Sequence, residues 1–252
     1  ARELGAISGD GMIYKILERL EHFLYKHSTV CIGQSQEIVD YIAAHGAKAT
    51  YLFRNGVAPE RFEGIEHHQR EDKLRIVYTG LLGYAQGILG ICEHIEFAKL
   101  NAEFHIYGAG GEQQSIEAYL AAHPNQGIYF HGKVAREEIP SILSQYDCTL
   151  IPLVKNIYGA VPSKIYESMA AGLPIIFSGE GEGARIIQDN RLGRVSSALD
   201  YEGLTINIQE ASTNTLAYLE SAANCLSCAQ NKFNRPKQIN GLYTYLSQIP
   251  LS

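Results

Sequence analysis

The 252-residue chain has no excess of basic residues, because 21 Lys and Arg stand against 27 Asp and Glu, for a formal net charge of −6. Binding of a nucleic-acid backbone needs clustered Lys and Arg, so this balance argues against a nucleic-acid partner. No apolar run approaches the roughly 18 residues of a membrane span. With 46% apolar and 19% charged residues, the composition is that of a globular chain and excludes disorder and collagen-like repeats.

The chain also lacks the paired cysteines of a disulfide framework. Its cysteines are an odd, scattered set, which predicts buried thiols in a reducing compartment; they are Cys31, Cys92, Cys148, Cys225 and Cys228. The last two are spaced like a metal or redox pair, but no second Cys or His pair accompanies them, so we interpret them as thiols on the flank of a helix. No His, Asp or Glu cluster demands a metal, and we interpret His67 and His68 as a solvated pair in a linker.

The first part of the chain predicts a small β-α-β unit. Residues 14–26 carry a helical apolar stripe, and apolar runs at residues 29–32 and 49–53 flank a helix that starts after Ser35 and ends near Gly46. About fifty residues bury too little apolar surface to fold alone. We therefore interpret residues 1–55 as the end of a separate N-terminal domain, with its hinge, whose beginning is missing from this chain.

From residue 73 apolar runs alternate with amphipathic helical stretches. The runs cover residues 74–79, 104–107, 128–131, 149–152, 174–178 and 194–196. Continuous apolar strands separated by helices predict an α/β domain with a parallel sheet and helices on both faces, of the doubly wound, Rossmann-like kind. We place this domain at residues 56–252, with closing helices at residues 213–233 and 235–247 that are divided at Arg235-Pro236.

Two glycine-rich loops follow predicted strands, at residues 80–87 and 107–112. Such loops bring backbone N–H groups close to a phosphate when they follow a parallel strand and precede a helix. Their glycines lack the GxGxxG spacing, and no acidic residue follows at the ribose position, which disfavours an NAD site. The alternative interpretation is a tight turn between strand and helix.

A third segment predicts an anion site at the start of a short helix. Pro162 suits the first turn of this helix, and Gly172 suits its end. Ser163 and Lys164 supply free N–H groups and an ammonium group at the positive end of the helix dipole. Glu167, three residues after Lys164, is placed to accept hydrogen bonds from ribose hydroxyls. The alternative is a solvated Lys164–Glu167 pair that stabilises the helix by about 0.2–0.5 kcal/mol.

These segments occur in order and at intervals typical of one enzyme family. They read RNGV at 54–57, IYGAGGE at 106–112, FHGKV at 130–134 and PSKIYESMAAGLPII at 162–176, together with the glycine loop at 80–87. The set resembles family-4 retaining glycosyltransferases of the GT-B fold, group 1, and mainly their C-terminal donor-binding half. Within that family the chain most resembles the bacterial surface-polysaccharide subgroup, which includes amino-sugar transferases.

The resemblance implies a nucleotide-sugar donor, UDP-linked, with no further cofactor and no metal. Lys164 and Glu167 would be the catalytic residues, with Glu167 on the ribose and Lys164 on the diphosphate. The implied substrate-binding residues are Gly80, Gly83, Gln86, Gly132, Lys133, Val134, Pro162, Ser163, Lys164 and Glu167. Among these, residues 132–134 would meet the nucleobase, and residues 80–87 would face the phosphates.

The sequence departs from the family pattern at three positions. Many members carry Arg and Lys where this chain has Leu81 and Gln86, and a hexose-binding Glu where it has Gly159. Lys164 is therefore the main candidate for stabilising the departing diphosphate.

The resemblance implies transfer of a sugar, with retention, to a glycan or polyprenyl-linked acceptor during surface-polysaccharide synthesis. The expected location is the cytoplasm, at the inner face of the membrane, with peripheral membrane contact through the missing N-terminal part, and the chain alone is expected to bind donor without transferring sugar. Two alternatives stay open: a non-catalytic nucleotide-sugar-binding partner subunit, and a GT-B-like sugar-nucleotide epimerase, which the PSK motif disfavours.

Overall fold

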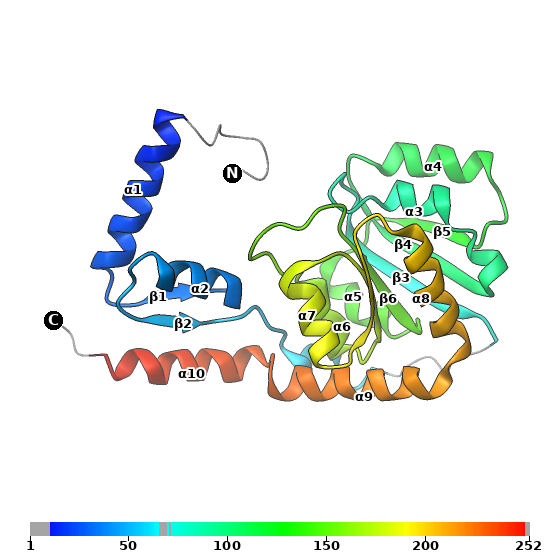
Figure 1. Ribbon diagram of the computed structural model, residues 1–252. Helices are drawn as coiled ribbons and strands as arrows, with labels where there is room; N and C mark the ends of the chain where they lie inside the picture. Colours follow the sequence, from blue (N-terminus) through cyan, green and yellow to red (C-terminus); the bar gives the residue numbers. More distant parts are fainter. Residues whose placement is uncertain (1–10, 66–69, 71, 250–252) are drawn as a thin grey trace.

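The protein combines a six-stranded parallel sheet, covered by helices on both faces, with a smaller β-α-β unit (Figure 1). The computed structural model describes residues 11–65, 70 and 72–249, so the prediction for His67 and His68 lies outside the described residues. The α/β class predicted from the alternating apolar runs is confirmed.

The small unit contains α1 (Met12–His27), β1 (Cys31–Gly33), α2 (Gln36–Ala44) and β2 (Thr50–Leu52). Strands β1 and β2 pair in parallel, as the two short apolar runs predict. Ser35 caps α2 as predicted, because its hydroxyl accepts a hydrogen bond from the Ile38 N–H at 3.3 Å. Helix α1 has no buried residue and extends away from the sheet of this unit in Figure 1.

The large unit begins with the hinge and contains all six predicted strands. Its elements are η1 (Pro59–Phe62), β3 (Leu74–Leu81), α3 (Ile88–His94), η2 (Phe97–Leu100), β4 (Ala102–Ala109), α4 (Gln113–Ala122), β5 (Ile128–Gly132), η3 (Arg136–Glu138), α5 (Ile139–Leu143), β6 (Cys148–Pro152), α6 (Lys164–Ala170), β7 (Ile175–Ser178), α7 (Gly181–Asp189), β8 (Gly193–Ser196), α8 (Tyr201–Thr213), α9 (Thr215–Asn231) and α10 (Arg235–Ser247). The strand order is β5-β4-β3-β6-β7-β8.

The continuous apolar strands supply both faces of the sheet, because successive side chains point to opposite sides. Ile76 and Leu150 belong to one buried cluster, together with α3 and α8. Their neighbours Val77 and Ile151 belong to the other cluster, together with α6, α7 and α9. The central strands β6 and β7 are thus buried on both faces, which explains why their sequences show no alternation of polar and apolar residues. The edge strand β5 does alternate, because every second residue is exposed.

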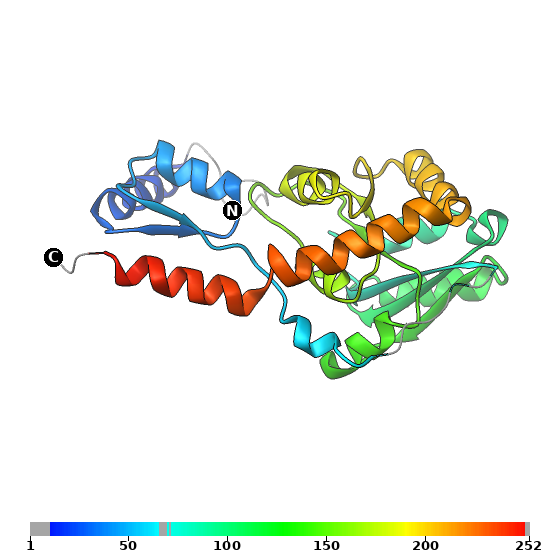
Figure 2. The ribbon, with the colours of Figure 1, turned by 90° about the horizontal axis from the view of Figure 1, so that it is seen from below.

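The last two helices divide where the sequence predicts a break. Helix α9 starts later than predicted because α8 runs to Thr213, and the Asn214 side chain then caps α9 by accepting from the Ala217 N–H at 3.1 Å. Helix α10 lies beside β2 (Figure 2), where the Tyr51 and Tyr245 rings are 4.6 Å apart. The C-terminal helix therefore joins the two units.

The thiols are buried, as the scattered cysteines predict, and all five cysteines are free. Cys225 and Cys228 lie on α9, and the Cys225 thiol packs 3.3 Å from the Leu173 carbonyl oxygen. Among the helices that the structure describes, none is long and apolar enough to cross a bilayer.

Candidate functional site

The strand order creates a switch point between β3 and β6. From β3 the chain proceeds to β4 on one side, and from β6 to β7 on the other. Ligands of open α/β sheets bind outside the carboxyl ends of strands at such a point. Here those ends lead into the glycine loop after β3 and into the β6–α6 loop, residues 153–163.

Lys164 occupies this switch point. Its Nζ donates to the Tyr78 hydroxyl at 2.8 Å and lies 4.1 Å from the centre of the Tyr78 ring. The side chain runs over Gly80, where an added Cβ would lie only 2.4 Å from the Lys164 Cε. Burial lowers the pKa of the Lys164 ammonium to about 8, against the opposing effect of the Glu167 charge. Lys164 therefore remains largely cationic at neutral pH.

A pocket of about 250 Å³ adjoins Lys164. Four of its lining residues are among those predicted to bind the substrate, namely Gln86, Pro162, Ser163 and Lys164. The Gln86 Oε1 atom is buried without a hydrogen-bond partner among the described residues. Because a buried acceptor is costly without a partner, this oxygen is suited to accept a hydrogen bond from a donor group of a ligand. Lys155, which the sequence analysis missed, adds a second basic side chain to the wall.

Glu167 lies in a neighbouring pocket of about 430 Å³ that shares Ser163 with the first. Three arginines line the same pocket, Arg61, Arg136 and Arg235. They come from η1, η3 and α10, which are far apart in the sequence. The Glu167 carboxylate therefore shares its pocket with three basic side chains that no sequence motif predicts.

A third pocket, of about 490 Å³, brings Gly80 next to Lys133 and Val134, the residues predicted to meet a nucleobase. Tyr107 and Gly108 complete this pocket on the β4 side. A Cβ at Gly108 would lie 1.9 Å from the Gly80 carbonyl oxygen, so the first two glycine loops meet through their backbones. The first and third pockets lie at the carboxyl ends of β6 and of β3 and β4, and the Glu167 pocket adjoins the first through Ser163.

Two predicted residues line none of these three pockets. Gly83 forms a turn, in which its carbonyl accepts from the Gln86 N–H at 2.9 Å. Gly132 ends β5 with φ at +77°, and an added Cβ there would have nothing within 4 Å. Pro162 also differs from expectation, since α6 begins at Lys164 and Pro162 precedes it by two residues.

The structure does not form the solvated Lys164–Glu167 pair that was the alternative interpretation. No ion pair joins these two described side chains, because Lys164 turns toward Tyr78 while Glu167 lines the arginine pocket. The two side chains thus contribute to separate but adjoining parts of one surface. Such an arrangement suits an extended ligand with a charged group near Lys164 and hydroxyls near Glu167.

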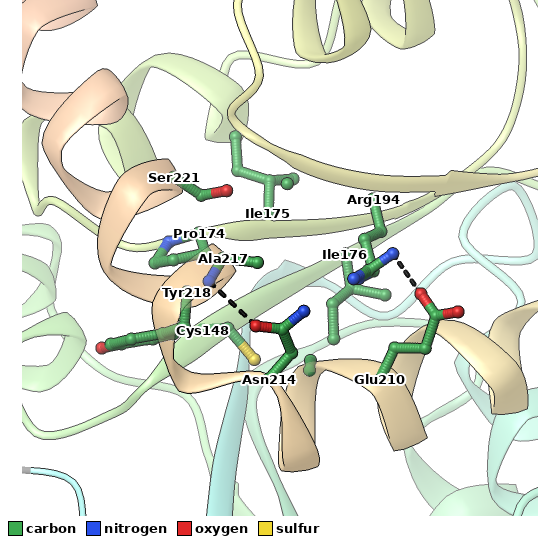
Figure 3. Close-up of a pocket in the computed structure, with 12 residues that line it drawn as sticks. Cys148, Pro174, Ile175, Ile176, Arg194, Glu210, Asn214, Ala217, Tyr218 and Ser221 are labelled. Carbon is green, nitrogen blue, oxygen red and sulfur yellow. Dashed lines mark hydrogen bonds and ion pairs between the residues drawn. The ribbon is translucent and has the colours of Figure 1, made fainter.

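A further pocket, of about 190 Å³, lies at the opposite edge of the sheet (Figure 3). It is formed where β6, β7 and β8 begin, under α8 and α9, and its rim carries an ion pair between Arg194 and Glu210. None of the residues predicted for donor binding lines it. We therefore separate it from the switch-point site.

The doubly wound sheet with its switch-point site is that of a Rossmann-like domain, the fold that the C-terminal half of GT-B proteins shares. A model of the family described as "Glycosyl transferases group 1" matches residues 73–214, more than half of the chain. The chain therefore belongs to the group 1 glycosyltransferases. A comparison with curated proteins found no match.

Solved GT-B structures share this fold. HepE of Anabaena, in complex with UDP, superimposes with a TM-score of 0.79 at 15% identity, over 96% of this chain and 70% of HepE. Sucrose-phosphate synthase of Thermosynechococcus elongatus superimposes with a TM-score of 0.72 at 18% identity, over 92% of this chain and 62% of the synthase. TarM of S. aureus, in complex with fondaparinux, alpha-GlcNAc-glycerol and UDP, superimposes with a TM-score of 0.71 at 14% identity, over 94% of this chain and 48% of TarM. This chain thus spans from about half to about two-thirds of their lengths.

Proposed function

We propose that this chain binds a UDP-linked sugar and serves as the donor-binding half of a family-4 retaining glycosyltransferase. The observation that carries the proposal is Lys164, a partly buried cation at the switch point between β3 and β6, beside a pocket that Gln86 and Ser163 also line. A diphosphate is the part of a nucleotide sugar that such a cation recognises. HepE structures with UDP and with UDP-glucose support this choice of donor.

The three adjoining pockets accommodate the parts of the donor in order. Lys133 and Val134 would contact the base, with Gly132 ending the strand that presents them; Glu167 would accept hydrogen bonds from the ribose; and Lys164 would hold the diphosphate. Gly80 and Pro162 shape the walls next to Lys164, and Gly83 fixes the turn that presents Gln86.

In the proposed reaction an acceptor hydroxyl attacks the anomeric carbon from the face that the leaving diphosphate occupies. The bond between that carbon and the diphosphate oxygen breaks, and the hydroxyl proton passes to the departing diphosphate. Lys164 would stabilise the charge that develops on this leaving group, an effect that is strong in a buried site. No pair of carboxylates at glycosidase spacing is needed for such a step.

The proposed acceptor is a glycan or a polyprenyl-linked sugar in surface-polysaccharide synthesis, reached in the cytoplasm at the inner face of the membrane. The neighbours that support this setting are WaaG, which is described as involved in lipopolysaccharide biosynthesis, and TarM, whose complex contains alpha-GlcNAc-glycerol. A hexose or an amino sugar would be the group transferred.

One observation favours a second candidate, a partner subunit that binds nucleotide sugars without catalysis. Gly159 packs so closely on α2 that a Cβ would lie 2.4 Å from the Ile38 Cγ1. No carboxylate side chain fits at this position of the β6–α6 loop. Assays with a panel of UDP-sugars separate the candidates, because UDP binding without transfer to any acceptor would favour the partner subunit.

Isothermal titration with UDP and GDP tests the donor site. Lys164→Ala and Glu167→Ala are each expected to weaken UDP binding by about 1–3 kcal/mol, since each removes a charge-assisted hydrogen bond. Lys99→Ala is the matched control, because Lys99 is exposed and pairs with Glu96 far from the site. Failure of the folded, unaltered chain to bind either nucleotide would refute the assignment.

A further inference from the structure

The small unit reaches the β6–α6 loop through Glu37 of α2. Its Oε2 accepts a hydrogen bond from the Gly159 N–H at 2.7 Å, and its carbonyl oxygen accepts one from the Tyr158 hydroxyl at 2.9 Å. The other carboxylate oxygen pairs with Arg185 of α7. The Glu37 side chain is only 14% exposed. One carboxylate therefore ties the small unit to two elements of the large one.

The loop is shaped to receive this carboxylate. Gly159 has φ at +73°, a conformation that favours glycine. Its Cα faces α2 so closely that an added Cβ would contact Ile38 and, at 3.2 Å, the Ser35 hydroxyl. The loop backbone thus lies directly on the first turn of α2, with its amide directed at Glu37.

Glu37 is itself held by a carboxylate from the large unit. Glu182 of α7, whose side chain is 3% exposed, accepts hydrogen bonds from the Gln36 and Glu37 N–H groups at 2.9 and 3.0 Å. It also pairs with Arg54 of the hinge. Glu182 therefore fixes the start of α2, and α2 in turn fixes the loop.

The same loop forms a wall of the pocket beside Lys164. Lys155 and Ile157 line the pocket before Gly159, and Ala160 to Ser163 line it afterwards. Because Gly159 lies between these two groups, its position sets the shape of the wall. A loop that is already ordered loses less conformational entropy when a ligand binds.

We propose that Glu37 is a positioning residue of the donor site, which holds the β6–α6 loop in its ligand-binding shape through the Gly159 amide. This role rests on the proposed function, because the ligand is the UDP-sugar donor assigned there. Glu37 does not contact the donor; it acts through the loop. The small unit thereby contributes to donor affinity.

The test compares substitutions that separate the hydrogen bond from the charge. Glu37→Asp keeps the charge but withdraws the carboxylate from the Gly159 amide, so the Kd for UDP is expected to rise about 5- to 10-fold, the loss of roughly one hydrogen bond. Glu37→Gln keeps an acceptor oxygen and loses the charge, and its Kd should stay within about twofold of the unaltered chain. Asp40→Ala is the control, because Asp40 lies on the same helix and accepts from the Gln36 side chain.

Hydrogen exchange of the ligand-free chain supplies a second measurement. Glu37→Asp should speed amide exchange in residues 155–162 while leaving β3 and β6 unchanged, whereas a general loss of stability would speed both. Equal UDP affinity in all variants, or equal losses in Glu37→Asp and Glu37→Gln with unchanged loop exchange, would overturn the role of Glu37. Absence of UDP binding by the unaltered chain would instead overturn the proposed function.

Discussion

Lys164 is a cation whose charge changes close to physiological pH. Burial lowers its pKa from the ordinary 10.5 to about 8, so the ammonium form dominates below pH 8 and the neutral amine above it. A diphosphate is attracted to the ammonium form only. The phosphate groups of the proposed ligand are largely ionised above pH 7, because the second phosphate pKa is about 6. At this site the change of charge expected between pH 7 and pH 9.5 is therefore that of Lys164.

UDP affinity is therefore expected to fall as the pH rises from 7 to 9.5, by up to about tenfold if one charge-assisted bond is lost. Titration calorimetry across this range measures the fall, and proton uptake on binding should appear near pH 8 to 9 in buffers of different ionisation enthalpy. In Lys164→Gln, which has no charge to lose, affinity should be weak and independent of pH. An equal fall in both proteins would show that another group is responsible.

At the scale of elements, the sequence predicts the strands but not how their ends meet. The central strands of the large unit, such as β6 and β7, are nearly continuous apolar runs, which is sufficient to predict a parallel sheet covered by helices on both faces. The strand order depends on the pairing of β3 with β6, which joins residues about seventy apart such as Ile76 and Cys148. The contact of the β3 end with α6 joins residues more than eighty apart. The glycine at position 80 is visible in the sequence; its contact with Lys164 is not.

Gly80→Ala tests that contact between β3 and α6. The added Cβ would collide with Lys164 at a φ of +145°, so both the UDP affinity and the melting temperature are expected to fall. Gly64→Ala is the control, because Gly64 also has positive φ, +71°, but nothing lies within 4 Å of its Cβ. That variant should lose about 1–2 kcal/mol of stability, the cost of a left-handed conformation for a residue with a Cβ, while UDP affinity stays unchanged. Equal UDP affinity in Gly80→Ala and the unaltered chain would argue against a ligand at this crossing.

The candidate site shows the same limit of sequence reasoning. Lys155 could have been found, because it follows β6 at the switch point, as Lys164 does. Arg61, Arg136 and Arg235 could not, because they reach the Glu167 pocket from three separate segments. Glu37 could not have been found either. Nothing in the sequence indicates that a glutamate on a helix of the small unit contacts a loop more than a hundred residues away.

At the scale of the whole molecule, the hinge and α10 join the small unit to the large one, and so do the ion pair and the hydrogen bonds of the buried Glu182 carboxylate. Glu182 pairs with Arg54 and accepts from the start of α2, and it is almost completely inaccessible. Removing one partner of a buried pair leaves the other charge without compensation, which costs about 3–5 kcal/mol. An exposed pair of the same kind contributes only about 0–1 kcal/mol.

Glu182→Ala is therefore expected to lower the free energy of unfolding by about 3–5 kcal/mol, and adding Arg54→Met should restore part of this loss, since the orphaned guanidinium is then absent. Urea unfolding measures both. The matched control is Glu220→Ala, which removes the exposed Arg191–Glu220 pair, with side chains 80% and 60% exposed, and should change stability by about 0.5 kcal/mol or less. If Glu182→Ala were as mild as this control, the apolar contacts of α10 with β2, including Tyr51 on Tyr245, would have to hold the small unit in place. The hydrogen bond from the Gly159 amide to Glu37, which holds the β6–α6 loop, would then not depend on Glu182.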